Sequence, residues 1–295
     1  MNHIVLDLEW NQAADAASTV TQPLRLSSEI VQIGAVKLNA AWQVTDTFKL
    51  TVRPAFYKTV HFKVRQLTGL RGKDLAGGQD FVAAIHSFLA WCGPEFDLFS
   101  WGPDDHGVLR DNLLIHGLSA NLVPPCRDLQ LIFDDQITRL GRQIALKTAV
   151  EAVGLTLSDA HDALADALAT AGLCAHLDMA KGLADYPALA DRITPPSLFS
   201  LSLPTTYSTK QAALKDPALR RLEHPTLTGT LFCTDWVADS VWKYLALGSD
   251  EGKNTYFVTL KFARSADGRL SVRRTVHPLN QKLHAIYKEK SEKHG

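Results

Sequence analysis

Three segments near the start of the chain carry the hydrophobic pattern of β-strands. Residues 4–9 (Ile-Val-Leu-Asp-Leu-Glu) are mostly apolar, and a second apolar run covers residues 30–38 after a polar, Ala/Ser/Thr-rich segment. Residues 43–52 then place Val, Phe and Leu side chains among polar ones, a composition that favours a strand. Because the connections are too short for crossover helices, we predict three mostly antiparallel strands.

Beyond residue 80 the pattern alternates between helical and extended segments. Apolar residues at helical spacing, or a high content of Ala and Leu, predict helices over residues 80–91, 106–116, 128–134, 145–153 and 160–177. A buried strand is predicted over residues 96–101, directly after the Gly93-Pro94 break. Strands first, followed by alternating strand and helix, predict an α/β domain with a mixed sheet.

The C-terminal part of the chain has a different character. Residues 194–206 are rich in Pro, Ser and Thr, which predicts a linker. Residues 256–263 and 270–276 are rich in β-branched and aromatic side chains, and the intervening Ser265-Ala266-Asp267-Gly268 is typical of a hairpin turn. The charged residues 282–295 predict a helix or a frayed tail.

The chain of 295 residues has no net charge, but its two predicted parts differ in charge. Residues 1–194 form the main predicted domain and carry 16 Lys and Arg against 22 Asp and Glu, a balance of −6. Residues 195–295, predicted to be a linker and an accessory region of unknown fold, carry 15 against 9, a balance of +6. An acidic body suits a cation site and a basic region suits a polyanion, although both patterns are also typical of solvated surfaces.

Other features of the sequence bound the class of protein. The longest apolar runs fall short of the roughly 18 residues needed to span a bilayer, which excludes an integral membrane protein. Asp7 and Glu9 fall where a signal peptide would be apolar, so we expect a cytoplasmic location. The four cysteines are scattered without a C-x-x-C pair, which predicts reduced, buried thiols rather than a zinc site.

The first candidate for chemistry is the pair Asp7 and Glu9. Residues two apart on a strand project to the same face, and apolar residues on both sides indicate a central strand. Burying two carboxylates without partners is costly, so we expect a positive group nearby. A divalent metal with oxygen ligands would meet that need, whereas exposure on an edge strand is the alternative.

A second candidate lies at the start of the predicted helix 160–177. His161 and Asp166 are five residues apart, about 500° around a helix, and they converge only if His161 lies at or before the helix N-terminus. Asp162 and Asp166 could instead form an exposed acidic face, and Asp159 is placed to cap the helix.

A third candidate follows the predicted strand 96–101. In Trp101-Gly102-Pro103-Asp104-Asp105, either acid could simply cap the next helix. The carboxyl end of a strand is also where α/β proteins commonly build their sites.

Taken together, these segments resemble the DEDDh family of 3′–5′ exonucleases, whose motifs are a D-x-E strand, a mid-domain Asp and H-x(4)-D. The resemblance covers roughly residues 1–180 and implies a ribonuclease H-like fold with a mixed central sheet flanked by helices. Trp10 after the D-x-E motif and the W-G-x-x-D spacing are similar to the branch that contains sporulation-inhibitor-like and histone-mRNA exonucleases. The segments that carry the resemblance are Ile4–Glu9, Glu29–Val36, Gln66–Leu70, Trp101–Asp105 and His161–Ala167.

The resemblance also implies roles for individual residues. The expected metal ligands are Asp7, Glu9, Asp105 and Asp166, which would bind two Mg²⁺ or Mn²⁺ ions, with Asp104 as the alternative to Asp105. His161 would act as the general base, which suits an imidazole near neutrality. Trp10 would stack on a terminal base, and the alternative is that it belongs to the core. Leu67 and Thr68 would contact the scissile end, and a packing role is the alternative for both.

The resemblance implies the function of a metal-dependent 3′–5′ exonuclease, and the arrangement of carboxylates supports it. It would hydrolyse phosphodiester bonds at 3′ ends of single-stranded nucleic acid and release nucleoside 5′-monophosphates, with RNA favoured over DNA. The alternatives are a DNA proofreading or repair exonuclease, and a catalytically inactive nucleic-acid-binding regulator. A homodimer remains open, as does a role for residues 253–274 as either an RNA-binding hairpin or a solvated basic sheet face.

Overall fold

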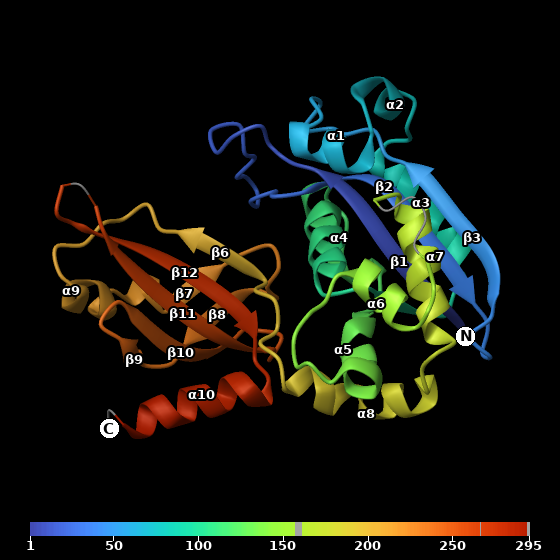
Figure 1. Cartoon of the computed structure of the whole chain (residues 1–295). Helices are drawn as coiled ribbons and strands as arrows, with labels where there is room; N and C mark the ends of the chain where they lie inside the picture. Colours follow the sequence, from blue (N-terminus) through green and yellow to red (C-terminus); the bar gives the residue numbers. More distant parts are fainter. Residues whose placement is uncertain (157–160, 266, 294–295) are drawn as a thin grey trace. The chain divides into compact units, whose positions relative to one another are not determined.

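The computed structural model describes residues 1–156, 161–265 and 267–293 and divides into two compact units (Figure 1). The first unit covers Met1–Pro187 and the second covers Ala188–Gly295. No helix among the described residues is both long and apolar enough to cross a bilayer.

The first unit is built on a mixed sheet of five strands in the order β3-β2-β1-β4-β5. β1 lies at the centre, antiparallel to β2 and parallel to β4, while β3 and β5 form the two edges. The strands are β1 (Asn2–Asn11), β2 (Glu29–Leu38), β3 (Val44–Thr51), β4 (Phe96–Ser100) and β5 (Cys126–Asp128). The predicted α/β class with a mixed central sheet and flanking helices is therefore confirmed.

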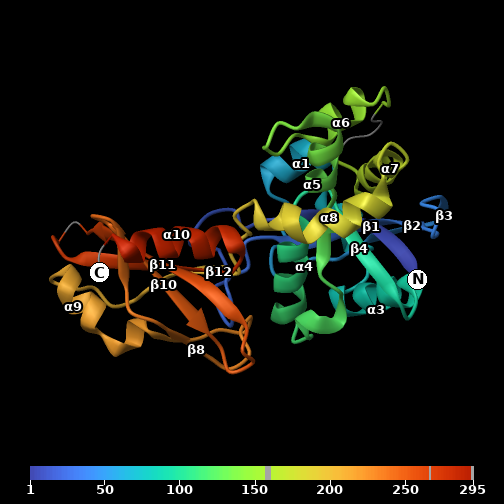
Figure 2. The ribbon, with the colours of Figure 1, turned by 90° about the horizontal axis from the view of Figure 1, so that it is seen from below.

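Helices cover both faces of this sheet (Figure 2). On one face, α3 and α4 bury Ile85, Phe88 and Leu109 against Ile4 and Leu98 of the sheet. The helices of the opposite face, α5, α6 and α7, share a second apolar cluster. The helices are α1 (Phe62–Thr68), α2 (Gly72–Ala76), α3 (Phe81–Cys92), α4 (Asp104–Ile115), α5 (Leu129–Phe133), α6 (Leu146–Ala152), α7 (Ala163–Cys174) and α8 (Met179–Asp191).

Helix α7 packs unusually close to β2. A Cβ atom on Gly34 would lie 2.1 Å from the backbone carbon of Ala163, the first residue of α7, so only glycine fits there. The Ala163 N–H donates to Oε1 of Gln32 at 2.9 Å, which fixes the start of the helix against the strand. The first turn of α7 is thereby held beside the end of β1.

The predicted helix 160–177 differs from the structure at both ends. Ala160 and Asp159, expected to begin and cap it, lie outside the described residues. The helix starts at Ala163 with Asp162 as its N-cap, whose side chain accepts from the Ala165 N–H at 3.2 Å. Two short helices, α1 and α2, were not predicted because residues 62–76 lack a clear apolar period.

The second unit is a seven-stranded sheet in the order β6-β12-β11-β10-β8-β7, with β9 paired to β10. Its elements are β6 (Phe199–Ser202), α9 (Lys210–Lys215), β7 (Arg221–Glu223), β8 (Thr230–Cys233), β9 (Val237–Ser240), β10 (Lys243–Ser249), β11 (Thr255–Arg264), β12 (Leu270–Pro278) and α10 (Gln281–Glu292). The segment predicted to be a linker contains β6, which pairs with β12, because Phe199 and Leu201 pack into an apolar cluster of this sheet. The hairpin of β11 and β12 and the C-terminal helix agree with the sequence pattern; its turn includes residue 266, outside the described residues.

An RNA-binding hairpin would need aromatic rings that are accessible to a ligand, but the rings of this hairpin are buried. Tyr256 is 5% exposed and Phe257 is 3% exposed. Apolar clusters lie on both faces of the sheet, so alternate residues of β11 are buried in opposite directions: Tyr256 packs with Val258 and Val276, and Phe257 with Leu283 of α10. Among the basic residues of this segment, Arg274 is 1% exposed and donates to backbone carbonyls, whereas Lys261, Arg264, Arg269 and Arg273 are exposed.

Candidate active site

Asp7 and Glu9 lie on one face of the central strand β1, as the two-residue spacing predicts. Their flanking residues, Leu6 and Leu8, are buried, so the carboxylates emerge from an apolar strand. Burial, followed by the nearby Asp105 and Asp166, holds the pKa of Asp7 well above its usual value. Burial and the neighbouring Asp166 raise the pKa of Glu9 to about 8. Burial is the main cause of both shifts, and the neighbouring acids add to it.

Asp105 reaches the same strand from the first turn of α4. The Leu8 N–H donates to its Oδ1 at 2.9 Å, so the carboxylate is bonded to the residue between Asp7 and Glu9. Asp105 is 6% exposed, and burial raises its pKa to about 7. Its neighbour Asp104 lines the same cleft but is exposed, so of the two acids it is Asp105 that bonds to β1.

A further buried carboxylate, Asp128 at the end of β5, was not singled out from the sequence. Its Oδ1 accepts from the Gly102 N–H at 3.0 Å and from the Gln130 N–H at 2.8 Å. Gly102 has φ +98°, a conformation that favours glycine. Asp128 therefore holds the turn that delivers Asp105, and the signal for it was its place at the end of a strand next to β4.

His161 and Asp166 converge because the backbone reverses before α7 begins. His161 has φ +69° and precedes the N-cap, and its N–H donates to Oδ2 of Asp166 at 3.1 Å. The other oxygen of Asp166, Oδ1, is buried and has no hydrogen-bond partner among the described residues, and burial raises the pKa of this group. Glu9, His161 and Asp166 offer ligand atoms that all lie within 4.8 Å of one another. Asp162 points elsewhere and pairs with Lys49.

One cleft of about 390 Å³ is lined by five of these acids and the histidine: Asp7, Glu9, Asp104, Asp105, Asp166 and His161. Helix α1 forms a wall of it through Lys63, Val64, Leu67 and Thr68, of which only Leu67 and Thr68 were expected there. The side chain of Leu67 is 57% exposed, which leaves it available for contact with a bound molecule.

The other two predicted substrate-contacting residues also line the cleft but have packing roles. The Thr68 hydroxyl donates to the Val64 carbonyl at 2.9 Å and accepts from the Leu70 N–H at 3.1 Å, so it is engaged in the end of α1. Trp10 is half-buried and packs against the core while one side faces the cleft.

Comparison with known families places this geometry in context. The model of the exonuclease family RNase_T matches residues 4–174, more than half of the chain. The search of curated proteins found no match to this chain.

Several solved structures share the fold. The nuclease domain of 3′hExo, a DEDDh family member, bound to rAMP, is 18% identical with a TM-score of 0.52, over 59% of this chain and 90% of that one. A 3′-exonuclease that recognises the histone mRNA stem-loop is 17% identical with a TM-score of 0.51, over 59% and 80%. Exonuclease I of E. coli with a dA16 oligonucleotide is 16% identical with a TM-score of 0.50, over 83% of this chain and 54% of that one. Since Met1–Pro187 is 187 of 295 residues, this last match extends into the second unit.

Proposed function

Because the chain belongs to the exonuclease family, we propose that it is a metal-dependent 3′–5′ exonuclease acting on single-stranded nucleic acid. It hydrolyses the terminal phosphodiester bond and releases nucleoside 5′-monophosphates. The observation that carries the proposal is the convergence of four carboxylates, from β1, α4 and α7, with one histidine in a single cleft.

The carboxylates fit divalent cations. Among the described residues, no Lys or Arg forms an ion pair with any of the four acids, and the nearby Lys49 pairs with Asp162 instead. The buried, unpartnered Oδ1 of Asp166 and the raised pKa of Glu9 mark the same shortage of positive charge. Hard oxygen donors suit Mg²⁺ or Mn²⁺, and we assign Asp7, Glu9, Asp105 and Asp166 to hold two such ions. When bound, they supply a more acidic attacking water and stabilise charge at phosphorus.

His161 supplies the base in this proposal. Its side chain is exposed at the cleft, so it can accept a proton from the attacking water and pass it to solvent. The bond from its backbone N–H to Asp166 sets where the ring lies relative to the carboxylates. General-base catalysis of this kind contributes about 10²–10⁴ in rate.

Trp10, Leu67 and Thr68 position the 3′ end of the strand. Both Trp10 and Leu67 line the cleft: Trp10 offers a ring for stacking on the terminal base, and Leu67 of α1 offers an exposed apolar side chain. Base stacking and apolar contact do not depend on base identity, so the enzyme accepts varied sequences.

RNA is the substrate that we favour, within the branch of histone-mRNA and sporulation-inhibitor-like exonucleases. The support is that one structure reported above is bound to the ribonucleotide rAMP and another recognises the histone mRNA stem-loop. In addition, Trp10 and the W-G-x-x-D spacing resemble that branch. DNA is the second candidate, because the match to exonuclease I with dA16 is the one that extends into the second unit. We assign residues 1–194 as the exonuclease domain and residues 195–295 as an accessory region.

The test uses 5′-labelled single strands of RNA and DNA with one sequence, incubated with Mg²⁺, with Mn²⁺ or with chelator. A 3′–5′ exonuclease produces a ladder that shortens from the 3′ end and stops when metal is removed. Asp7→Asn and Asp166→Asn are expected to abolish the ladder, whereas the exposed Glu151→Gln serves as a matched control. Near-normal cleavage by Asp7→Asn would overturn the proposal.

A further inference from the structure

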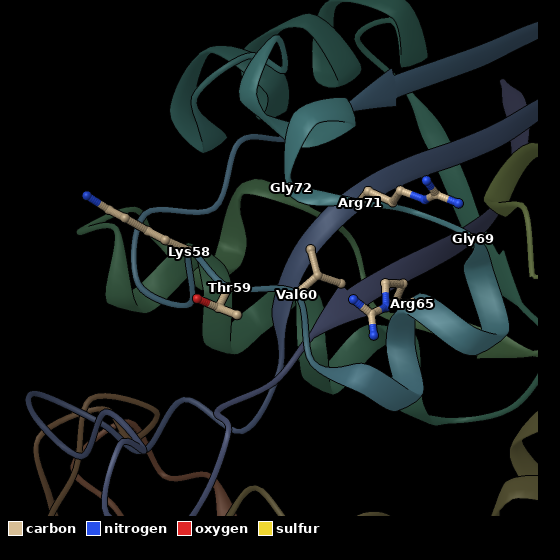
Figure 3. Close-up of a pocket in the computed structure, with 7 residues that line it drawn as sticks. All are labelled: Lys58, Thr59, Val60, Arg65, Gly69, Arg71 and Gly72. Carbon is tan, nitrogen blue, oxygen red and sulfur yellow. The ribbon is translucent and has the colours of Figure 1, made fainter.

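A second hollow of about 650 Å³ lies on α1 and the loops around it, and its charge is opposite to that of the cleft. It is lined by Lys58, Thr59, Val60, Arg65, Gly69, Arg71 and Gly72 (Figure 3). We propose that this basic hollow binds the sugar-phosphate backbone of the strand upstream of the bond that is cut. The inference rests on the proposed function.

The charge of this region stands out from the domain around it. Residues 53–73 contain six Lys and Arg and no Asp or Glu, although residues 1–194 carry a balance of −6. Lys58, Arg65 and Arg71 are exposed, and no ion pair joins any of them to a described acid. Unpaired guanidinium groups are suited to phosphate, which they bind through two parallel hydrogen bonds.

Helix α1 separates the hollow from the cleft. At about 100° per residue, Lys63, Val64, Leu67 and Thr68 form one face of the helix, and Arg65 lies roughly 130° from its centre. The same helix therefore presents a mostly uncharged wall to the cleft and an arginine to the hollow. Since a helix with its side chains is about 10–12 Å across, the two sites are separated by more than one phosphate but remain within reach of one short strand.

The charges are arranged for a chain rather than for a single ion. In Figure 3 the Lys58 side chain extends away from the two arginines, so the positive groups are spread along the hollow. Gly69 and Gly72 complete its lining, and open space lies where each Cβ would be. A polymer with regularly spaced phosphates meets such an arrangement at several points, whereas free phosphate would meet one.

The backbone around Lys58 is fixed by buried side chains. Asn11, at the end of β1, donates from Nδ2 to the carbonyls of Tyr57 at 2.7 Å and Thr59 at 3.0 Å, on both sides of Lys58. Glu29 accepts from the N–H groups of residues 55–57. Asn11 ends the strand that carries Asp7 and Glu9. These hydrogen bonds therefore fix the loop of the hollow to the same strand that positions the two carboxylates.

The experiment compares the full chain with Arg65→Gln/Arg71→Gln and with the control Arg142→Gln/Lys147→Gln, which removes two exposed charges that line neither site. Cleavage is measured on a dinucleotide and on a decanucleotide, each as RNA and as DNA. Binding of the 5′-labelled decanucleotide is measured by fluorescence anisotropy over a range of salt concentrations, with chelator to prevent turnover.

For the hollow variant we expect kcat/KM on the decanucleotide to fall about tenfold relative to the dinucleotide. Since single strands release about 0.7 counterion per phosphate contact, loss of two contacts makes the log–log salt slope shallower by about 1.4. The control variant should retain the wild-type salt slope and the wild-type ratio of kcat/KM between the decanucleotide and the dinucleotide. If only phosphates are recognised, the variant should lose activity and salt dependence equally on RNA and on DNA. A loss confined to RNA would assign the contact to the 2′-hydroxyls and would overturn the phosphate assignment.

An unchanged salt slope, or an equal loss on both substrate lengths, would overturn the inference. If the wild-type chain cleaves neither strand, the proposed function is wrong, whereas the anisotropy measurement still decides whether the hollow binds nucleic acid. The two failures are therefore distinguishable.

Discussion

The crowding of carboxylates in the cleft has a measurable cost in stability, and Glu9→Gln isolates it. Burial and Asp166 raise the pKa of Glu9 from 4.5 to about 8 in the folded protein. Below pH 4.5 the side chain is protonated in both the folded and the unfolded chain, and no cost arises. As the pH rises toward 8 the unfolded chain loses this proton and the folded chain keeps it, so the free energy of unfolding decreases. Above about pH 8 the full cost is present.

The size of the effect follows from the shift. A change from 4.5 to about 8 corresponds to about 5 kcal/mol at 1.4 kcal/mol per pH unit, and partial contact of Glu9 with solvent reduces this to about 2–4 kcal/mol. Glutamine has the shape of a protonated glutamate and cannot ionise. With chelator present, Glu9→Gln should therefore be more stable than wild type by that amount at pH 8, and by under about 1 kcal/mol at pH 5.

Thermal unfolding followed by tryptophan fluorescence measures the difference, because Trp10 and Trp101 line the same cleft. For a domain of this size each kcal/mol moves the Tm by about 2–4 °C, so we expect a gain of at least about 4 °C at pH 8. Mg²⁺ or Mn²⁺ should stabilise wild type more than the variant and so reduce the difference in Tm between the two proteins. Glu151→Gln, at an exposed position, is the control and should show neither effect. A wild-type Tm in chelator that does not fall between pH 5 and pH 8 would refute the reasoning.

Three other changes test separate parts of the site. His161→Ala should lower kcat about 10²–10⁴-fold and retain Mn²⁺ binding by calorimetry; loss of the metal would make His161 a ligand instead of a base. Gly34→Ala should lower the free energy of unfolding by at least the roughly 1–3 kcal/mol typical of overpacking, and so lower the Tm, because its Cβ would collide with Ala163. It should also lower kcat by displacing Asp166, and an unchanged Tm would contradict the packing. A chain of residues 1–194 should still cleave a dinucleotide but bind long strands with a shallower salt slope, and equal slopes would exclude residues 195–295 from binding.

Four of the five strands of the central sheet could be predicted, because β1, β2 and β4 are mostly apolar and β3 places apolar residues among polar ones. β5 has only three residues and was missed. The pair Asp7 and Glu9 was visible because two acids in an apolar strand are conspicuous. The position of His161 before the helix could not be predicted. The sequence analysis stated it only as the condition under which His161 and Asp166 would converge. A positive φ at a non-glycine residue is set here by the hydrogen bond to Asp166, and periodicity does not report such a bond.

Elements held by distant contacts escaped the sequence analysis. Helix α1 has seven residues and no amphipathic period, and buried hydrogen bonds from Asn11 and Glu29 hold the loop that leads into it. The basic hollow depends on the same loop. In the second unit, strands of three or four residues such as β7 and β9 are too short to show alternation. The burial of Tyr256 and Phe257 on opposite faces required α10, whose place on the sheet the sequence did not reveal.

The attachment of the 55–61 loop to Asn11 also determines how the cleft can adapt. Moving the α1 wall would leave buried donors and acceptors unpaired, at about 1–3 kcal/mol for each group. We therefore expect the loop to keep its position when a ligand enters the cleft, so that adjustment to the size of the ligand falls to exposed side chains such as Leu67. In the proposed exonuclease, the strand would then advance after each cut past a backbone that stays in place.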